Sequence, residues 1–188
     1  ALPAATAALA RLEPPFVLMV GTIEPRKGHD HALAAFELLW ARGSALPLVI
    51  AGRPGWKTAP LQQRLREHPQ AGSRLFWLSD ADDACLAWLY AHCGGVLLAS
   101  RGEGLGLPLL EAQHFGKPIL ARQLPVFREI GGDGLDYFGG DGAAALAQSL
   151  TEWVRREDWG ATAPSRWLKV EDRQGVLEVL RQSLGTGG

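Results

Sequence analysis

The feature that most constrains the fold is a regular alternation of short apolar runs with segments that carry apolar residues at helical spacing. Residues 16–20 and 46–51 are two such runs, closed by Gly21 and Gly52. Between them, residues 29–41 repeat apolar side chains every three or four positions, as the buried face of a helix does. Strands that alternate with helices predict βαβ units and a mostly parallel sheet.

The same reasoning extends along the chain and predicts a Rossmann-like α/β fold with helices on both faces of the sheet. The strand runs are almost continuously apolar, which is typical of strands covered on both sides. We expect strands at residues 16–20, 46–51, 75–78, 95–99, 118–121 and 135–138, and helices at residues 29–41, 61–67, 82 or 83 to 92, 108–115, 142 to about 156, and 171–184.

Length and composition limit what the chain can be. Its 188 residues suffice for one buried core, so we expect a single domain over residues 1–188 with its core at about 14–183. A net charge of −1 argues against a nucleic-acid partner. No apolar run reaches the roughly 20 residues that span a bilayer. Cys85 and Cys93 are too far apart for a CxxC unit, and we expect free thiols and a cytoplasmic protein.

Ligands of open parallel sheets bind at the carboxyl ends of the strands, so the loops there are the candidate site. The loop after the first strand contains Arg26 and Lys27 directly before a helix. Two cations and the free N–H groups of a helix start suit a phosphate. A solvated Arg-Lys pair is the alternative.

The loop after the fourth strand is richer in ligand-binding features. Its three glycines, at positions 102, 104 and 106, let the backbone approach a ligand closely. The N–H groups of Gly106 and Leu107 stand at the start of the next helix and can face an anion. Glu103 in the loop and Glu111 in the helix place one carboxylate on each side of the phosphates, where each can accept hydrogen bonds from hydroxyl groups of the ligand. The loop therefore predicts a sugar–diphosphate–ribose ligand.

Five segments, in order and at the expected spacing, make the chain resemble the group 1, family 4 glycosyltransferases. Residues 103–111 match the family's E-x7-E signature, and residues 21–28 match its G-T-x-E-P-R-K loop. Residues 50–57 (IAGRPGWK) are similar to the family's V-x-G-K-x-G-W segment. Residues 76–90 are similar to its F-L-G-x-V-S-D-E stretch, and residues 126–138 (VFREIGGDGLDYF) to a third family segment. The resemblance covers about residues 14–183.

The resemblance implies a GT-B enzyme, in which two Rossmann-like domains enclose a cleft. This chain resembles the C-terminal, donor-binding domain. The N-terminal acceptor domain, with the family's usual catalytic His, is expected to be a separate part of the same enzyme. The family transfers sugars with retention of configuration and without a metal or other cofactor, so the ligand is the nucleotide sugar itself.

Roles for individual residues follow from the same resemblance. Arg26 and Lys27 correspond to the family's diphosphate-holding cations, Glu103 to the contact with the donor sugar, and Glu111 to the contact with the ribose hydroxyls. We treat Arg26, Lys27 and Glu103 as the candidate catalytic residues. The remaining candidate donor contacts are Gly21, Thr22, Leu78, Ser79, Gly104, Leu105, Gly106 and Leu107.

The predicted function is retaining transfer of a hexose from a nucleotide sugar to a glycan or a lipid-linked acceptor. The T-x-E-P-R-K loop favours GDP-mannose as the donor, and UDP- and ADP-sugars are the alternative donors. Thr22 and Ser79 depart from the arginine and glycine that many members have. The alternatives are half of a GT-B sugar-nucleotide epimerase and a non-catalytic nucleotide-sugar-binding module.

The acceptor also bears on where the enzyme works. A membrane-associated acceptor would bring the enzyme to the inner face of the membrane through the acceptor domain.

Trp56 is a candidate ligand contact, because it follows Gly55 in a loop that faces the site. Packing against the protein is the alternative.

Overall fold

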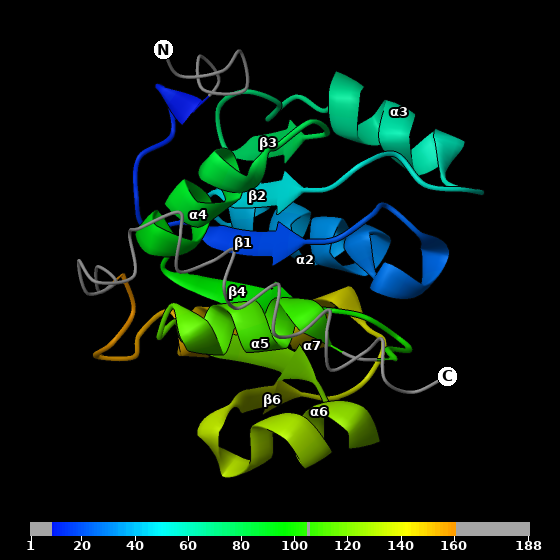
Figure 1. Cartoon of the computed structure of the whole chain (residues 1–188). Helices are drawn as coiled ribbons and strands as arrows, with labels where there is room; N and C mark the ends of the chain where they lie inside the picture. The colour runs from blue at the N-terminus through cyan, green and yellow to red at the C-terminus, as the bar shows by residue number, and fades with distance from the viewer. Residues whose placement is uncertain (1–8, 105, 161–188) are drawn as a thin grey trace.

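A computed structural model describes residues 9–104 and 106–160 of the chain. They form a six-stranded, wholly parallel sheet with the strand order β3-β2-β1-β4-β5-β6. Helices cover both faces, as Figure 1 shows. The predicted α/β class, parallel sheet and two-sided covering are confirmed.

The strands are short and differ from the predicted ranges by at most two residues at either end. They are β1 (Val17–Val20), β2 (Leu48–Ala51), β3 (Leu75–Leu78), β4 (Gly95–Leu98), β5 (Ile119–Arg122) and β6 (Asp136–Phe138). The helices are α2 (His29–Ala41), α3 (Ala59–Glu67), α4 (Asp83–His92), α5 (Leu107–His114), α6 (Pro125–Gly131) and α7 (Ala143–Trp153), with 3-10 turns η1 (Pro25–Lys27) and η2 (Gly132–Gly134).

The sheet separates two apolar cores because successive strand residues point to opposite faces. In β1, Leu18 belongs to the core under α4, α5 and α6, whereas Val17 and Met19 belong to the core under α2 and α7. Helix α2 packs directly on α7 behind the sheet in Figure 1, while α4 and α5 lie in front of it.

The strand order reverses between β1 and β4. The chain moves outward from β1 to β2 and β3, then returns to the centre and continues through β4, β5 and β6. The helices that follow β1 and β4 therefore leave the sheet on opposite faces, and their loops diverge at the carboxyl edge. This edge is the right-hand side of the sheet in Figure 1, towards which the arrows point.

A local capping signal accounts for the start of α4. Asp82 is the N-cap of α4, and its side chain accepts a 2.8 Å hydrogen bond from the backbone N–H of Cys85. The sequence did not predict α6, because its apolar residues lie between Pro125 and the Gly131-Gly132 pair, and such flanking residues by themselves indicate a loop. The helix expected at residues 171–184 lies outside the described residues.

Both cysteines are buried and free, and burial raises the pKa of the Cys93 thiol to about 12. In the described part of the chain, no helix has both the length and the apolar character needed to cross a bilayer.

Candidate functional site

The loops after β1 and β4 are in direct backbone contact. Gly28, which joins η1 to α2, adopts a left-handed conformation with φ of 73°. A Cβ atom at this position would stand 2.1 Å from the carbonyl oxygen of Ala99. The backbone N–H of Arg101 donates a 2.7 Å hydrogen bond to the carbonyl of Arg26. This close approach requires glycine at position 28, because no side chain fits between the two loops.

This contact brings the three candidate catalytic residues together. The Lys27 ammonium donates a 2.6 Å hydrogen bond to Glu103 Oε2, and Arg26 Nη1 lies 3.5 Å from Glu103 Oε1. Ser100 Oγ donates a third contact, of 3.1 Å, to Glu103 Oε2. The side chains of Lys27 and Glu103 are only 13% and 10% exposed. The solvated-pair alternative therefore suits Arg26, at 51% exposure, and not Lys27.

The electrostatics of this cluster keep Glu103 ionised. Burial by itself would raise the pKa of the carboxyl, but the hydrogen bond and charge of Lys27, with Ser100 and Arg26, outweigh it and lower the pKa below 4.5. Beside them, burial and the charge of Lys27 lower the pKa of His29 to about 4. The His29 imidazole is therefore neutral near pH 7. Lys27, His29 and Glu103 line a small cavity of about 10 Å³.

Helix α5 supplies the other half of the predicted site. Gly106, in a left-handed conformation with φ of 60°, is the N-cap, and Pro108 occupies the first turn. One turn further, Glu111 is buried at 7% exposure and accepts a 2.6 Å hydrogen bond from Tyr90 Oη. The hydroxyl fixes one carboxylate oxygen of Glu111. Leu105 lies outside the described residues.

The other predicted contacts lie at the same edge but offer different groups. The Leu78 side chain is buried in the core and its carbonyl already accepts a 3.0 Å hydrogen bond from the Gly52 N–H, whereas Ser79 is exposed. Gly21 lies against the aliphatic stem of Lys27, and its carbonyl oxygen would be 1.8 Å from a Cβ at Gly52. The loops after β1 and β2 are thus also in backbone contact.

Sequence reasoning did not find the residues that hold the charged groups in place. Ser100 orients Glu103, Tyr90 orients Glu111, and Arg101 makes a two-point contact with Asp30 at 2.9 and 3.1 Å. Ser100 stands in the Gly-rich loop, so its position was a usable signal. Nothing in the spacing of Tyr90 and Asp30 identifies their partners, since these contacts are made between separate elements.

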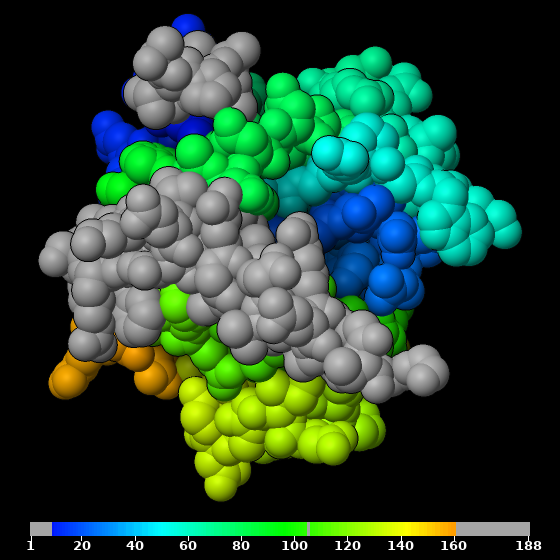
Figure 2. Space-filling view, in the orientation of Figure 1, coloured from blue at the N-terminus to red at the C-terminus, as the bar shows by residue number. Residues whose placement is uncertain are grey.

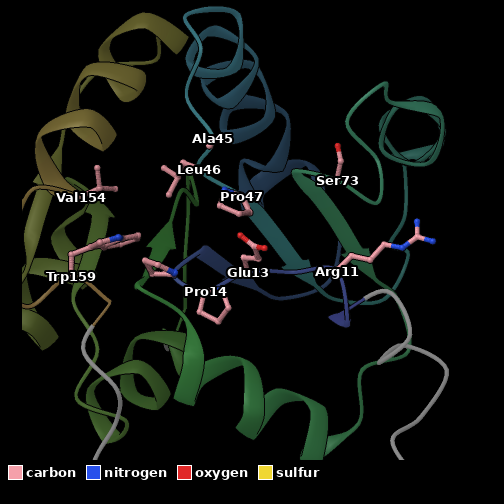
Figure 3. Close-up of a pocket in the computed structure, with 10 residues that line it drawn as sticks. Arg11, Glu13, Pro14, Ala45, Leu46, Pro47, Ser73, Val154 and Trp159 are labelled. Carbon is pink, nitrogen blue, oxygen red and sulfur yellow. The ribbon is translucent and has the colours of Figure 1, made fainter.

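A larger cavity, of about 470 Å³, lies at the opposite edge of the sheet (Figure 3). Pro14 and Pro47, which precede β1 and β2, line it together with Trp159. These positions lie at the amino ends of the strands, away from the charged cluster. Within the described ranges, no group of three or more His, Cys, Asp or Glu side chains is placed to hold a metal ion.

Comparison with known proteins identifies what this arrangement resembles. The family described as "Glycosyl transferases group 1" matches residues 6–166. The Escherichia coli serotype-specific mannosyltransferase WbdA is 46% identical over 140 residues, which cover 74% of this chain and 17% of WbdA. The E. coli O-antigen chain mannosyltransferase B is 29% identical over 157 residues, covering 81% of this chain and 40% of that protein.

A solved structure supports the fold independently. The C-terminal domain of a group 1 glycosyltransferase, LpcC, from Francisella tularensis superimposes with a TM-score of 0.64 at 18% identity, covering 89% of this chain and 86% of that one. This chain spans less than one fifth of WbdA and two fifths of the O-antigen chain mannosyltransferase.

The contact between the two loops makes a first prediction about Gly28. We expect Gly28→Ala to lower the free energy of unfolding more than Gly43→Ala, measured by urea denaturation. Both glycines have positive φ, and that alone costs alanine about 1–2 kcal/mol. Only at Gly28 does the new Cβ also meet backbone, because a Cβ at Gly43 would have no neighbouring atom within 4 Å. Equal losses would show that the loops separate without cost.

The lowered pKa of Glu103 makes a second prediction. A carboxyl with a depressed folded-state pKa stabilises the fold above its unfolded pKa, and this stabilisation is lost as the pH falls through the folded value. Glu103→Gln should therefore reduce stability at pH 7, and the difference from wild type should shrink below pH 4.5. Thermal unfolding across this range measures it, with the exposed Glu129→Gln as control. A difference independent of pH would contradict the ion pair.

Proposed function

This chain belongs to the group 1 glycosyltransferases, and on that basis we propose that it is the donor-binding part of a retaining hexosyltransferase. The observation that carries the proposal is the Lys27–Glu103 cluster, which lies at the reversal of strand order beside the start of α5. A cation for a diphosphate and a carboxylate for sugar hydroxyls stand side by side there. This is the arrangement that a nucleotide sugar requires.

The cluster can receive a donor without being dismantled. An ammonium group has three N–H donors, and Lys27 uses one of them for Glu103. The other two can face phosphate oxygens, next to the backbone N–H groups of Gly106 and Leu107 at the start of α5. Glu103 then accepts hydrogen bonds from the sugar, and Glu111, held by Tyr90, accepts those of the ribose.

The same groups would promote bond cleavage. When the bond between the sugar and the diphosphate breaks, negative charge grows on the phosphate oxygens. Lys27, held by Glu103, is a fixed donor for that charge, and a fixed donor needs no reorganisation at the moment of reaction. Its effect is larger because it is shielded from water, whereas Arg26, at 51% exposure, adds a more weakly acting cation.

We propose GDP-mannose as the donor and a glycan or lipid-linked glycan as the acceptor. The support is the 46% identity to a protein named as a mannosyltransferase, together with the likeness to an O-antigen chain mannosyltransferase. The acceptor side of the cleft would be formed by a further domain of the same enzyme, since this chain matches only part of each relative.

The proposal predicts that the chain binds nucleoside diphosphates through Lys27. Calorimetry with GDP, UDP and ADP should give the tightest binding with GDP, and Lys27→Ala should weaken it at least about tenfold, since a charge-assisted hydrogen bond contributes roughly 1.5–3 kcal/mol. Lys57→Ala is the matched control. Raising the salt concentration should weaken nucleoside diphosphate binding by the wild type more than by Lys27→Ala. Absence of heat with all three nucleotides would refute the proposal.

The two glutamate variants should affect the binding of two ligands differently. Glu103→Gln should weaken the binding of the nucleotide sugar about tenfold or more. It should leave the free diphosphate bound as well or better, because a carboxylate that competes for Lys27 is gone. Glu111→Gln should weaken both ligands alike, because both contain the ribose. Calorimetry with GDP and GDP-mannose compares them, with Tyr90→Phe reporting the structural share of the Glu111 contact. Equal losses for both ligands in both glutamate variants would contradict these roles.

A further inference from the structure

Arg122 is a buried guanidinium at the carboxyl end of β5, and no donor contact proposed above uses it. The residue is 6% exposed, and its side chain points, like that of Leu120, to the face of the sheet that α2 and α7 cover. After Arg122 the chain leaves the sheet through α6, which forms the yellow-green projection at the lower margin of the molecule, and it returns through β6 to Gly140 (Figures 1 and 2). A charge in such a place requires hydrogen-bonding partners.

The guanidinium finds these partners on three separate segments. Its Nε donates a 3.2 Å hydrogen bond to the carbonyl of Ala99, at the end of β4. Its Nη1 donates to the Gly140 carbonyl at 3.0 Å and to Asp141 Oδ1 at 2.9 Å. Its Nη2 lies 2.6 Å from His31 Nδ1 on α2. Because a guanidinium has donors only, the imidazole nitrogen is the acceptor of this last contact.

One of these contacts supports the loop that carries the carboxylate. The Ala99 carbonyl held by Arg122 is the group that leaves no room for a Cβ at Gly28. The same peptide group leads directly into Ser100, whose Oγ donates to Glu103 at 3.1 Å. Arg122 therefore fixes the peptide plane from which the contact to the carboxylate starts.

Another contact supports the loop that carries the cation. His31 is buried in the first turn of α2, which begins directly after Lys27 and Gly28. The N–H of Ala32 donates a 3.0 Å hydrogen bond to the Gly28 carbonyl, so this turn and the end of the cation loop form one unit. Through His31, Arg122 thus holds the position of the unit that follows Lys27.

A need for stability alone does not explain a charge at this position. Asp141 is a carboxylate partner of Arg122, but its side chain is 87% exposed, and the other acceptors described above are neutral. Apolar side chains of similar volume often stabilise a core as well as a buried ion pair does, or better. What a guanidinium adds is a rigid fork of donors that reaches several acceptors in fixed directions.

We propose that Arg122 is a positioning residue for the donor site. By bridging Ala99 and His31, it fixes the separation of the loops after β4 and β1, which contact the donor from two sides. It acts through these loops and does not touch the donor itself. The proposal rests on the proposed function, because the donor is the ligand whose contacts are aligned.

Arg122→Lys tests the bridge, because it keeps the charge while a single ammonium cannot reproduce the fork. Calorimetry with GDP should show binding at least about threefold weaker than in the wild type, as expected when one or two hydrogen bonds are lost. Lys117→Met is the matched control. Lys117 is an equally buried cation at the other end of β5, where it donates to the Cys93 carbonyl at 3.0 Å. The control should lower stability and leave the affinity for GDP unchanged. Unchanged affinity in Arg122→Lys would overturn the proposal.

Combining Arg122→Lys with Lys27→Ala separates positioning from general loosening of the fold. If Arg122 acts by placing the Lys27 loop, the double variant should lose less GDP affinity than the product of the two single losses, because the group being placed is already absent. Losses that multiply in full would contradict a positioning role.

A measurement without ligand distinguishes failure of this proposal from failure of the proposed function. The stability difference between wild type and Glu103→Gln at pH 7, measured by urea denaturation, should shrink when Arg122→Lys is also present, and a difference of full size would overturn the proposal. Should Arg122→Lys not fold, His31→Leu removes one acceptor of the bridge and is tested in the same ways. Wild type that binds no GDP would refute the proposed function alone, and the urea comparison would then decide the role of Arg122.

Discussion

The site depends on the close approach of two backbones at the centre of the sheet. Gly28 lies against the carbonyl of Ala99, and the adjoining hydrogen bond from Arg101 to Arg26 fixes the register between the two loops. Without this contact, the cation of one loop and the carboxylate of the other would be placed by flexible side chains alone. Because it is made by backbone, the contact sets their separation before any ligand binds.

Charge compensation is the second level of organisation. A partly buried ammonium and a partly buried carboxylate each lose hydration, and each is tolerated because the other is 2.6 Å away. Ser100 adds a hydrogen bond to the same carboxylate oxygen, and neutral His29 lines the same small cavity. The cluster therefore holds its geometry in the free protein, which suits a site that must stabilise charge at the moment of bond cleavage.

The carboxyl edge is rigid across three adjoining loops rather than one. Hydrogen bonds from Ile23 to Arg53 and from Trp77 to Gly52 join the loop after β2 to the same framework. The loop after β2 is thereby fixed relative to the loop that carries Lys27. A ligand that binds at this edge meets loops that are already ordered, so little conformational entropy is lost on binding.

The sequence by itself determined the alternation of strands and helices, the parallel sheet and the two loops that carry the charged residues, because strand and helix periods and glycine punctuation are local properties. It also placed Arg26, Lys27 and Glu103 in those loops. Only the tertiary structure decided that Lys27 is shielded while Arg26 is exposed, and that Tyr90 holds Glu111. These are contacts between elements distant in the chain, and no spacing encodes them. The sequence did not predict the short helix α6, because Pro125 and the Gly131-Gly132 pair that flank it indicate a loop by themselves.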